Sequence, residues 1–246
     1  MIIENPQLQD VPALRKLWKQ AFSDTDGFLD AFFLKAFSAE RALVARENNQ
    51  VIGALYWFDC FCNGKSLSYI YGVATDKAYR GRGVCKALMS ALHANMEQAE
   101  KGTILVPADD GLRAFYSRLG YRDFGGMEEM ICFAGNMPFP VEKLTANTYA
   151  QKRRQLLPEG SVWQEGAFLP FMDDQMDFFG GEGWLFALQK DFSPEFIGDK
   201  RLLPGILKAL QLPETRVRFA GKSPFAMYRG TAEDADKPKY FAFALD

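Results

Sequence analysis

The 246-residue sequence predicts an α/β fold in its first part and a smaller α+β region after it. Up to residue 135, segments with the period of an amphipathic helix alternate with apolar segments typical of strands. Within them, "YRGRGVCKALM" at residues 79–89 places a turn of glycines and arginines directly before an amphipathic helix. After "NMPFP" the pattern changes to two helices followed by strands, so we expect a boundary there, with domains at 1–136 and 137–246.

The first part begins with a short apolar strand, "IIENP", followed by two helices. In "DVPALRKLWKQAF", at residues 10–22, Asp10 is a candidate N-cap and Pro12 lies in the first turn. Apolar residues recur at the spacing of one helix face, at Leu14, Leu17, Trp18, Ala21 and Phe22. The strongly apolar segment "DGFLDAFFLKAF", at residues 26–37, predicts the second helix.

Three strands are expected next, within residues 41–75. Their turns are "ENNQ" and "NGK", and the second contains Asn-Gly, the strongest short signal for a β-hairpin. The helix after the glycine-arginine turn has an apolar face at Val84, Ala87, Leu88, Ala91, Leu92 and Met96. His93 lies beside that face, so we expect a partly exposed histidine rather than a catalytic one.

A buried strand, a short helix and a closing strand complete the first part. "GTILVPA", at residues 102–108, is apolar through its centre, as a buried strand requires. "DDGLRAFYSRLG", at residues 109–120, has one apolar stripe and ends at Gly120, a residue typical of helix C-termini. Residues 121–135 predict the last strand.

The second part has helical patterns at residues 145–157 and 168–180 and strand patterns at 183–190, 216–230 and 239–246. The glycines of "GGEG", at residues 180–183, are expected to end the second helix and form a turn. Helices followed by strands are typical of a separate α+β unit.

Composition and charge limit the classes of function. The net charge is −2 and the pI about 5.6, so we expect no nucleic-acid partner. One histidine excludes a multi-histidine metal site, and no zinc or disulfide framework fits the cysteines Cys60, Cys62, Cys85 and Cys132. Neither a signal peptide nor a membrane-spanning segment is apparent. These features favour a reduced, cytoplasmic protein with no metal and no membrane association.

The glycine-arginine turn fits neither of two common phosphate-binding motifs. In a Walker A loop, a glycine would stand where "RVRFAGKS" has Arg216. The dinucleotide motif G-x-G-x-x-G fits Gly81 and Gly83, but Lys86 stands at its third glycine.

General physical chemistry still favours an anion at this turn. The free amides of a helix's first turn attract negative charge, and glycines allow a close approach of the backbone. Arg80, Arg82 and Lys86 add positive charge. A solvated basic turn explains the same residues equally well.

"VATDKAYRGRGVCKALM" resembles the acetyl-CoA-binding motif [QR]-x-x-G-x-[GA] of the GNAT acyltransferase superfamily, with Arg80, Gly83 and Cys85 at its defined positions. Cys85 replaces the usual glycine or alanine but is still small. "GLRAFYSRLGYRDFG" resembles the second motif of the family, in which Phe-Tyr precedes Leu-Gly-Tyr or Leu-Gly-Phe. The resemblance covers residues 1–135 and implies a mixed, mostly antiparallel sheet with flanking helices. The α+β region is compatible with a degenerate second GNAT-like unit.

The resemblance also implies how coenzyme A would bind. Backbone amides of the turn would hold the pyrophosphate, and the strand before it would bond the pantetheine arm. This arm enters a gap between two parallel strands, here those that end at Thr75 and start at Thr103. The family commonly has Asn at a further contact position, which is Asp109 here. The implied coenzyme-binding residues are Val73, Ala74, Thr75, Arg80, Gly81, Arg82, Gly83, Val84, Cys85, Lys86 and Asp109.

Direct acyl transfer to an amine needs a neutral nucleophile, a stabilised oxyanion and a proton for the leaving thiolate. By the family pattern Tyr116 supplies that proton, although a core position on the apolar stripe of its helix would also explain this tyrosine. A backbone N–H near Val73 or Ala74 would polarise the thioester. Tyr69 and Tyr71 could line the acceptor cleft. The candidate bases, none of them preferred, are Asp59, Glu128 and Glu129.

We therefore expect an N-acetyltransferase that moves an acetyl group directly from acetyl-CoA to a primary amine of a small molecule or peptide. The alternatives are a non-catalytic acyl-CoA-binding sensor or scaffold, and a nucleotide-phosphate binder. Because the C-terminal region lacks the motif, we expect it to bind no coenzyme and to wall the acceptor cleft or form a homodimer interface. Some aminoglycoside-acetylating members use a C-terminal carboxylate as base, which here would be that of Asp246.

Overall fold

The computed structural model describes residues 1–164, 166–230 and 238–244. Strands of the N-terminal half, residues 1–136, are β1 (Ile2–Glu4), β2 (Ala42–Glu47), β3 (Gln50–Cys62), β4 (Lys65–Thr75), β5 (Gly102–Leu105) and β6 (Arg122–Phe133). Helices of this half are α1 (Val11–Ala21), α2 (Asp26–Ala31), α3 (Val84–Gln98) and α4 (Asp110–Ser117). Each element expected in this half is present.

Strands of the C-terminal half, residues 137–244, are β7 (Glu142–Leu144), β8 (Trp163–Gln164), β9 (Asp177–Gly181), β10 (Trp184–Gln189), β11 (Phe192–Ile197), β12 (Glu214–Ala220) and β13 (Ser223–Arg229). Helices of this half are α5 (Ala146–Leu156), α6 (Phe168–Met172) and α7 (Leu203–Ala209). Of these, β7, β8, β11 and α7 were not anticipated from the sequence, because each is short or lacks a clear hydrophobic period.

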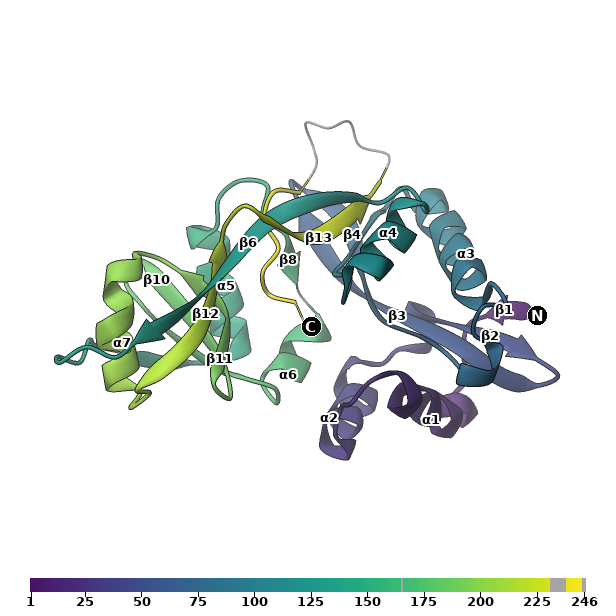
Figure 1. The fold of residues 1–246 in the computed structure, drawn as a ribbon, viewed down its shortest axis with the longest axis horizontal. Helices are drawn as coiled ribbons and strands as arrows, with labels where there is room; N and C mark the ends of the chain where they lie inside the picture. The colour runs from purple at the N-terminus through teal and green to yellow at the C-terminus, as the bar shows by residue number, and fades with distance from the viewer. Residues whose placement is uncertain (165, 231–237, 245–246) are drawn as a thin grey trace.

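The described strands form one sheet with helices on both faces (Figure 1). The order is β1-β2-β3-β4-β5-β13-β6-β12-β11-β10-β9-β7, and β8 pairs with β3. Only two neighbouring pairs are parallel, β4 with β5 and β11 with β12. The sheet is therefore mixed and mostly antiparallel, which confirms the predicted fold class.

Two hydrophobic clusters cover the two faces of the N-terminal half of the sheet. On one face, α1 buries Leu14, Leu17 and Trp18 against residues of β3 and β4. On the other, α3 buries Val84, Leu88 and Leu92. Figure 1 shows α1 and α2 on one side of β3, and α3 and α4 on the other. The helical spacing of apolar residues in the sequence decides which side of each helix is buried.

The second helix departs from regular geometry after its first turns. Thr25 caps α2 by accepting a hydrogen bond from the Phe28 amide at 3.2 Å. The chain then passes into a π-helical turn at Phe32–Ala36. The helix predicted at residues 26–37 is thus α-helical only in its first part, and the wider turn places Phe32 in the core.

The two halves exchange a strand with each other. From the C-terminal half, β13 lies between β5 and β6, with Tyr228 opposite Ile104 and Ala226 opposite Phe124. From the N-terminal half, β6 pairs in turn with β12, with Glu129 opposite Arg218. Figure 1 shows teal β6 running beside yellow-green β12 and β13. The domain boundary at residues 136 and 137 stays a prediction, since the sheet is continuous across it.

The C-terminal half repeats the topology of the N-terminal one. In the first half, the hairpin β3-β4 leads through a 3₁₀ turn and α3 to β5, which is parallel to β4. In the second, the hairpin β10-β11 leads through a 3₁₀ turn and α7 to β12, which is parallel to β11. An aspartate caps each 3₁₀ turn, Asp76 and Asp199. This repetition supports the interpretation of the second half as a degenerate second unit.

Three secondary-structure predictions in the C-terminal half are wrong. The helix predicted at residues 168–180 ends at Met172, and Asp177–Gly181 is a strand whose Phe178 and Gly180 pair with β10. Consequently the first two glycines of "GGEG" belong to strand β9, and Glu182 and Gly183 form the turn to β10. The strand predicted at residues 239–246 is, over its described residues, an extended segment with one bridge, Tyr240 to Ser161. Residues 177–181 are a strand because they pair with both β7 and β10, whereas the described C-terminal segment has only its single bridge.

A buried ion pair fixes this C-terminal segment. The Arg153 guanidinium donates to both Glu195 oxygens, at 2.7 and 2.9 Å, and to the Val162 carbonyl at 2.9 Å. Tyr149 and Tyr240 also donate to Glu195, at 2.9 and 3.1 Å. Both charged side chains are nearly inaccessible to solvent. The cluster therefore ties α5, β11 and the segment at residue 240 together.

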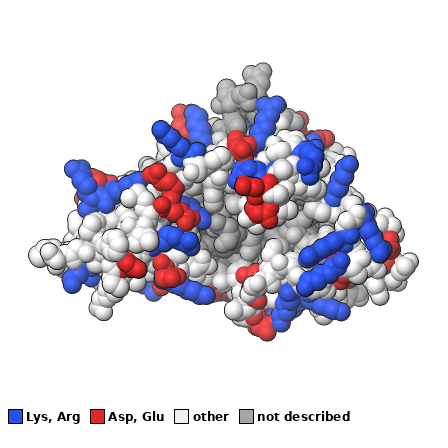
Figure 2. Space-filling model, in the orientation of Figure 1, with Lys and Arg blue, Asp and Glu red and all other residues white. Residues whose placement is uncertain are grey.

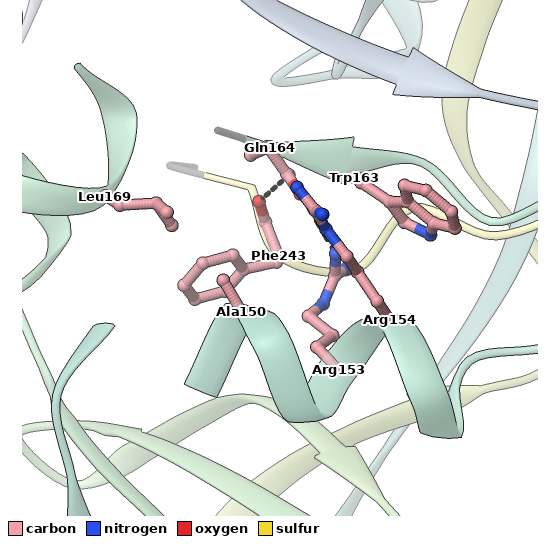
Figure 3. Close-up of a pocket in the computed structure, with 7 residues that line it drawn as sticks. All are labelled: Ala150, Arg153, Arg154, Trp163, Gln164, Leu169 and Phe243. Atoms are coloured by element: carbon pink, nitrogen blue, oxygen red, sulfur yellow. Dashed lines mark hydrogen bonds between the residues drawn. The ribbon is translucent and has the colours of Figure 1, made fainter. Parts of the chain in front are cut away.

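Figure 3 shows the space beside this cluster, with Arg153 and Arg154 of α5 near Gln164 and Trp163. The Gln164 amide donates to the Phe243 carbonyl, which adds a second tie to the C-terminal segment. The cavity holds only about 10 Å³. Such a volume admits at most one water, so this is a packing site and not a ligand site.

Replacing Arg153 with methionine should lower the free energy of unfolding by about 3–5 kcal/mol, because Glu195 would be left buried without its partner in the ion pair. Equilibrium unfolding in urea measures the change. Arg154→Met is the matched control, since Arg154 is exposed on the same helix and should cost about 1 kcal/mol or less. Equal losses in both variants would contradict the role of the pair.

Candidate functional site

The parallel strands β4 and β5, between which the resemblance places the pantetheine arm, stay paired over only a few residues and then separate. They pair only from Leu67 to Tyr69 on β4 and from Gly102 to Ile104 on β5. Beyond Tyr69, β4 continues to Thr75 while β5 ends at Leu105. From residue 72 to 75, the β5-facing backbone edge of β4 pairs with no strand among the described residues. An extended ligand could hydrogen-bond there as an additional strand.

A β-bulge in β4 accounts for the divergence. Ala54 pairs with Ala74 and Tyr56 with Tyr71, so a single residue of β3 lies opposite both Gly72 and Val73. A bulge bends its strand and increases its twist. Gly72 has a φ of +61°, and a Cβ there would lie 2.9 Å from the Trp18 ring. The bend therefore depends on a glycine that packs directly against α1.

The turn after β4 is open and its backbone is suited to an anion. Gly81 and Gly83 have φ values of +76° and +79°, which glycine adopts readily. A Cβ built at either position meets nothing within 4 Å. Gly83 is the N-cap of α3, and the first helical bond runs from Ala87 N to Gly83 O. The backbone amides that precede Ala87 in the first turn of α3 have no carbonyl partner within the helix.

Tertiary contacts hold the start of this turn in place. The Asp76 carboxylate accepts from Ala78 N at 2.9 Å and from the Gln20 amide of α1 at 3.1 Å. The Arg80 guanidinium donates to the Thr75 carbonyl at 3.3 Å. The turn is thus anchored on both sides, so its glycines are oriented before any ligand binds.

Positive charge surrounds the turn. Arg80, Arg82 and Lys86 are exposed, and no carboxylate of a described residue lies within ion-pair distance of them. A shallow hollow beside it is lined by further cations of α1 and of the turn, Arg15, Lys16, Lys19 and Lys77. Figure 2 shows Lys and Arg side chains gathered over this part of the molecule. The local potential favours an anion although the net charge of the chain is negative.

Cys85 lies in the first turn of α3 with a half-buried side chain. A helix N-terminus normally lowers a thiol pKa, but burial here raises the pKa of Cys85 to about 11. The thiol stays protonated at neutral pH. A neutral thiol is a weak nucleophile, so Cys85 is poorly suited to covalent catalysis.

Tyr116 is buried on α4 in the cluster beneath α3. Burial raises its pKa above the ordinary value, and the nearby Cys85 and Tyr121 contribute. The raised pKa keeps the phenol protonated. Because no described residue forms a hydrogen bond with the hydroxyl, its proton is available for donation. The structure brings Tyr116 near the start of α3, and it also packs in the core as the alternative interpretation expects.

Asp109 has a structural role that its sequence position did not reveal. It is the N-cap of α4, and its Oδ1 accepts a hydrogen bond from the Leu112 amide at 2.7 Å. The same oxygen cannot make that bond and also donate to a ligand, because a carboxylate only accepts. Helix capping explains an aspartate at this position without any ligand.

Sequence reasoning was wrong about His93, which is only 7% exposed. Its Nε2 lies 3.0 Å from the Tyr121 hydroxyl, which lies 2.9 Å from the Thr103 hydroxyl. Thr103 in turn donates to the Arg229 carbonyl of β13. The chain of polar groups joins α3, β5 and β13 behind Tyr116. A lone histidine beside an apolar face gives no signal for such partners.

Each base candidate on a strand is paired with a cation. Asp59 lies 3.3 Å from Lys101, Glu128 lies 2.8 Å from Lys200, and Glu129 lies 3.0 Å from Arg218. Of the tyrosines expected in the acceptor cleft, Tyr69 is buried and Tyr71 half-buried on the α1 side of β4. Asp246 lies outside the described residues.

A family model for the acetyltransferase (GNAT) domain matches residues 3–123, which contain the diverging strands and the open turn. Residues 3–123 of the chain thus carry a GNAT acetyltransferase domain. The family and the fold support an acyltransferase that takes its acyl group from an acyl-coenzyme A. No curated protein matches the chain by sequence.

Solved GNAT structures resemble both halves of the chain. A GCN5-related N-acetyltransferase from Kribbella flavida has a TM-score of 0.70 at 15% identity, over 93% of this chain and 70% of that one. A putative acetyltransferase from Pyrococcus horikoshii has a TM-score of 0.68 at 15% identity, over 98% and 91%. At these identities the likeness establishes the fold alone, and it includes the C-terminal half.

The described residues contain neither a cluster of metal ligands nor a helix that could cross a membrane. No three His, Cys, Asp or Glu side chains come together there as metal ligands would. In the same part of the chain, no helix has the length and apolar character needed to cross a membrane.

The stability of the fold should depend on the protonation of His93. Burial, with a contribution from Arg229, lowers its pKa from 6.5 to about 4, so the unfolded chain binds a proton in this range that the folded chain does not. The stability that depends on a neutral His93 is present above pH 6.5 and is lost as the pH falls to 4. Between these values the free energy of unfolding should fall by on the order of 2 kcal/mol more in the wild type than in His93→Gln.

Chemical unfolding at a series of pH values measures this difference. Glutamine can still hydrogen-bond Tyr121 but does not titrate, so carboxylates contribute equally to both curves. Parallel curves would mean that His93 is protonated in the folded chain.

Proposed function

We propose that the chain transfers an acetyl group from acetyl-CoA to a primary amine of a small molecule or peptide. The observation that carries the proposal is the open turn at Gly81 and Gly83, directly after a strand whose edge is unpaired. A pyrophosphate fits this turn because no side chain or backbone atom occupies the space at either glycine. The amides and cations around it supply the complementary charge.

In this proposal the coenzyme spans the turn and the gap. Amides from Arg80 to Lys86, including those of Gly81, Arg82, Gly83, Val84 and Cys85, would bind the pyrophosphate. Val73, Ala74 and Thr75 on the unpaired edge of β4 would bind the pantetheine arm. Asp109 is proposed here only as a helix cap, since its carboxylate accepts from Leu112 N.

The transfer needs no covalent enzyme intermediate. The acceptor ammonium first releases a proton to solvent, and its nitrogen lone pair then attacks the thioester carbonyl carbon. A backbone N–H of Val73 or Ala74 would stabilise the oxyanion. The C–S bond breaks, the nitrogen releases a second proton to solvent, and the sulfur takes the Tyr116 hydroxyl proton, which yields the N-acetyl amide and free coenzyme A. Tyr116 recovers its proton from solvent.

We propose that the C-terminal half forms one wall of the acceptor site and does not bind a second coenzyme. Phe168 of α6 packs 5.0 Å from Phe58, and Phe241 packs 4.9 Å from Tyr69, ring centre to ring centre. These contacts close one end of the α1 face of β4. The turn before α7, at residues 198–202, has neither the two glycines nor the open geometry of the turn before α3.

A non-catalytic acyl-CoA sensor or scaffold is the second candidate. The observation that favours it is the capping role of Asp109, together with the pairing of each strand carboxylate to a cation. In that case coenzyme binding would be retained and turnover would be absent.

Gly83→Trp should reduce acetyl-CoA affinity by at least about tenfold, because the ring would occupy the space proposed for the pyrophosphate. Isothermal titration with acetyl-CoA, 3′-dephospho-coenzyme A and ATP measures it. Gly64→Trp is the matched control, since Gly64 has a φ of +74° and open surroundings in the hairpin turn between β3 and β4. The control should bind as the wild type does.

Normal affinity in Gly83→Trp would contradict the pyrophosphate assignment. Equal binding of ATP and acetyl-CoA by the wild type would instead favour a general nucleotide-phosphate binder.

Tyr116→Phe should lower kcat for acetyl transfer about tenfold to a hundredfold, because the leaving thiolate would lose its proton donor. The KM for acetyl-CoA should not change, since the proposal places no coenzyme-binding group at this hydroxyl. Release of free thiol measures both constants. An unchanged kcat would show that Tyr116 only packs in the core.

A further inference from the structure

The face of β4 opposite α3 carries an aromatic surface at the bulge. Tyr71 and Gly72 both face α1 there, and the Trp18 ring lies against Gly72. The thioester of the proposed acetyl-CoA would lie at this point of β4. An acceptor that approaches the thioester from the α1 side would therefore contact the residues around Trp18.

Trp18 holds a carboxylate beside this point. Its indole Nε1–H donates to Asp24 Oδ2 at 2.8 Å. Asp24 lies in the loop between α1 and α2, and its side chain is half-buried. One indole ring therefore separates the Asp24 carboxylate from the backbone of the bulge. The hydrogen bond fixes one oxygen and leaves the other available.

No cation of a described residue lies within ion-pair distance of Asp24. Its neighbours differ in this respect, because Asp26 pairs with Lys19 and Asp30 pairs with Arg15 at 2.7 Å. A partly desolvated carboxylate without a counter-charge is stabilised by a cationic ligand. Asp24 is thus the carboxylate of this loop whose charge is not already neutralised.

Three half-buried rings surround the same indole. Phe22, Tyr71 and Phe28 lie 5.3, 5.6 and 6.2 Å from the Trp18 ring, centre to centre. Each is partly accessible to solvent. Aromatic faces attract ammonium groups and bind apolar groups equally well. The loop therefore places one carboxylate without a cationic partner among the described residues next to several half-buried aromatic rings.

We infer that Asp24, with Phe22, Phe28 and Tyr71 around Trp18, binds the ammonium group of the acceptor. The acceptor class is a primary amine on an apolar or aromatic body, and acidic acceptors are excluded. The inference deepens the proposed function and rests on it for the identity of the reaction. Asp24 binds and orients the amine and is not assigned the role of base.

The test compares Asp24→Asn with Asp30→Asn, using 2-phenylethylamine as the probe amine. Asparagine can still accept the indole hydrogen bond, so folding should be retained. In the presence of free coenzyme A, isothermal titration should show at least about tenfold weaker amine binding to Asp24→Asn than to the wild type. Asp30→Asn, whose carboxylate is exposed and paired, should bind as the wild type does. Phenylethanol, which lacks the charge, should bind both variants equally weakly.

Equal amine affinity in Asp24→Asn and the wild type would overturn the inference, as would the absence of amine binding to the wild type. Acetylation of the amine with equal KM in both proteins would also overturn it while supporting the proposed function. Binding of the amine through Asp24 with no acetylation would support the site and contradict the proposed reaction.

Discussion

The antiparallel pairing of β6 with β13 is the constraint on which the rest of this structure depends. It joins a strand of each half at the centre of the sheet, from Ser223 opposite Met127 to Tyr228 opposite Arg122. Because β13 also pairs with β5, β5 is held in place on its side away from β4. The bulge bends β4 beyond the residues that pair with β5. The gap between β4 and β5 therefore stays open without any ligand to separate the strands.

Polar groups are treated differently in the core and at the site. In the core, Arg153 and Glu195 neutralise each other, and His93, Tyr121 and Thr103 satisfy one another while staying uncharged. At the turn before α3, amides and cations are left open to solvent. Burying a charge costs free energy unless it is paired, so open charge belongs where a ligand binds. This contrast is a physical argument for the proposed anion site at the turn, and it does not depend on the family resemblance.

The bulge of β4 separates two functions onto two faces. On the α3 side lie the turn, Cys85 and Tyr116, which the proposed coenzyme would contact. On the α1 side lie Trp18, Asp24 and the aromatic rings proposed for the acceptor. The C-terminal half closes one end of that second face through Phe168 and Phe241. In the proposed function, the C-terminal half thereby contributes to the acceptor side of the site.

The sequence by itself determined the local features of this protein. Positive φ values at Gly81 and Gly83, the start of α3 at Val84 and the hairpin at Asn63 and Gly64 all depend on contacts within a few residues. Tyr116 and the strand ending at Thr75 could be found because their motifs are contiguous.

Tertiary structure alone decided the features that depend on distant partners. These include the exchange of β6 and β13, the strand at Phe178 where a helix was expected, and the burial of His93. They also include the surroundings of Asp24, because nothing in the order of residues shows which aspartate of the loop is held by Trp18 and which are held by cations. The hydrophobic period of a segment indicates which face of a helix or strand a residue occupies. The free energy of burying that residue depends on the groups that the rest of the chain brings to it.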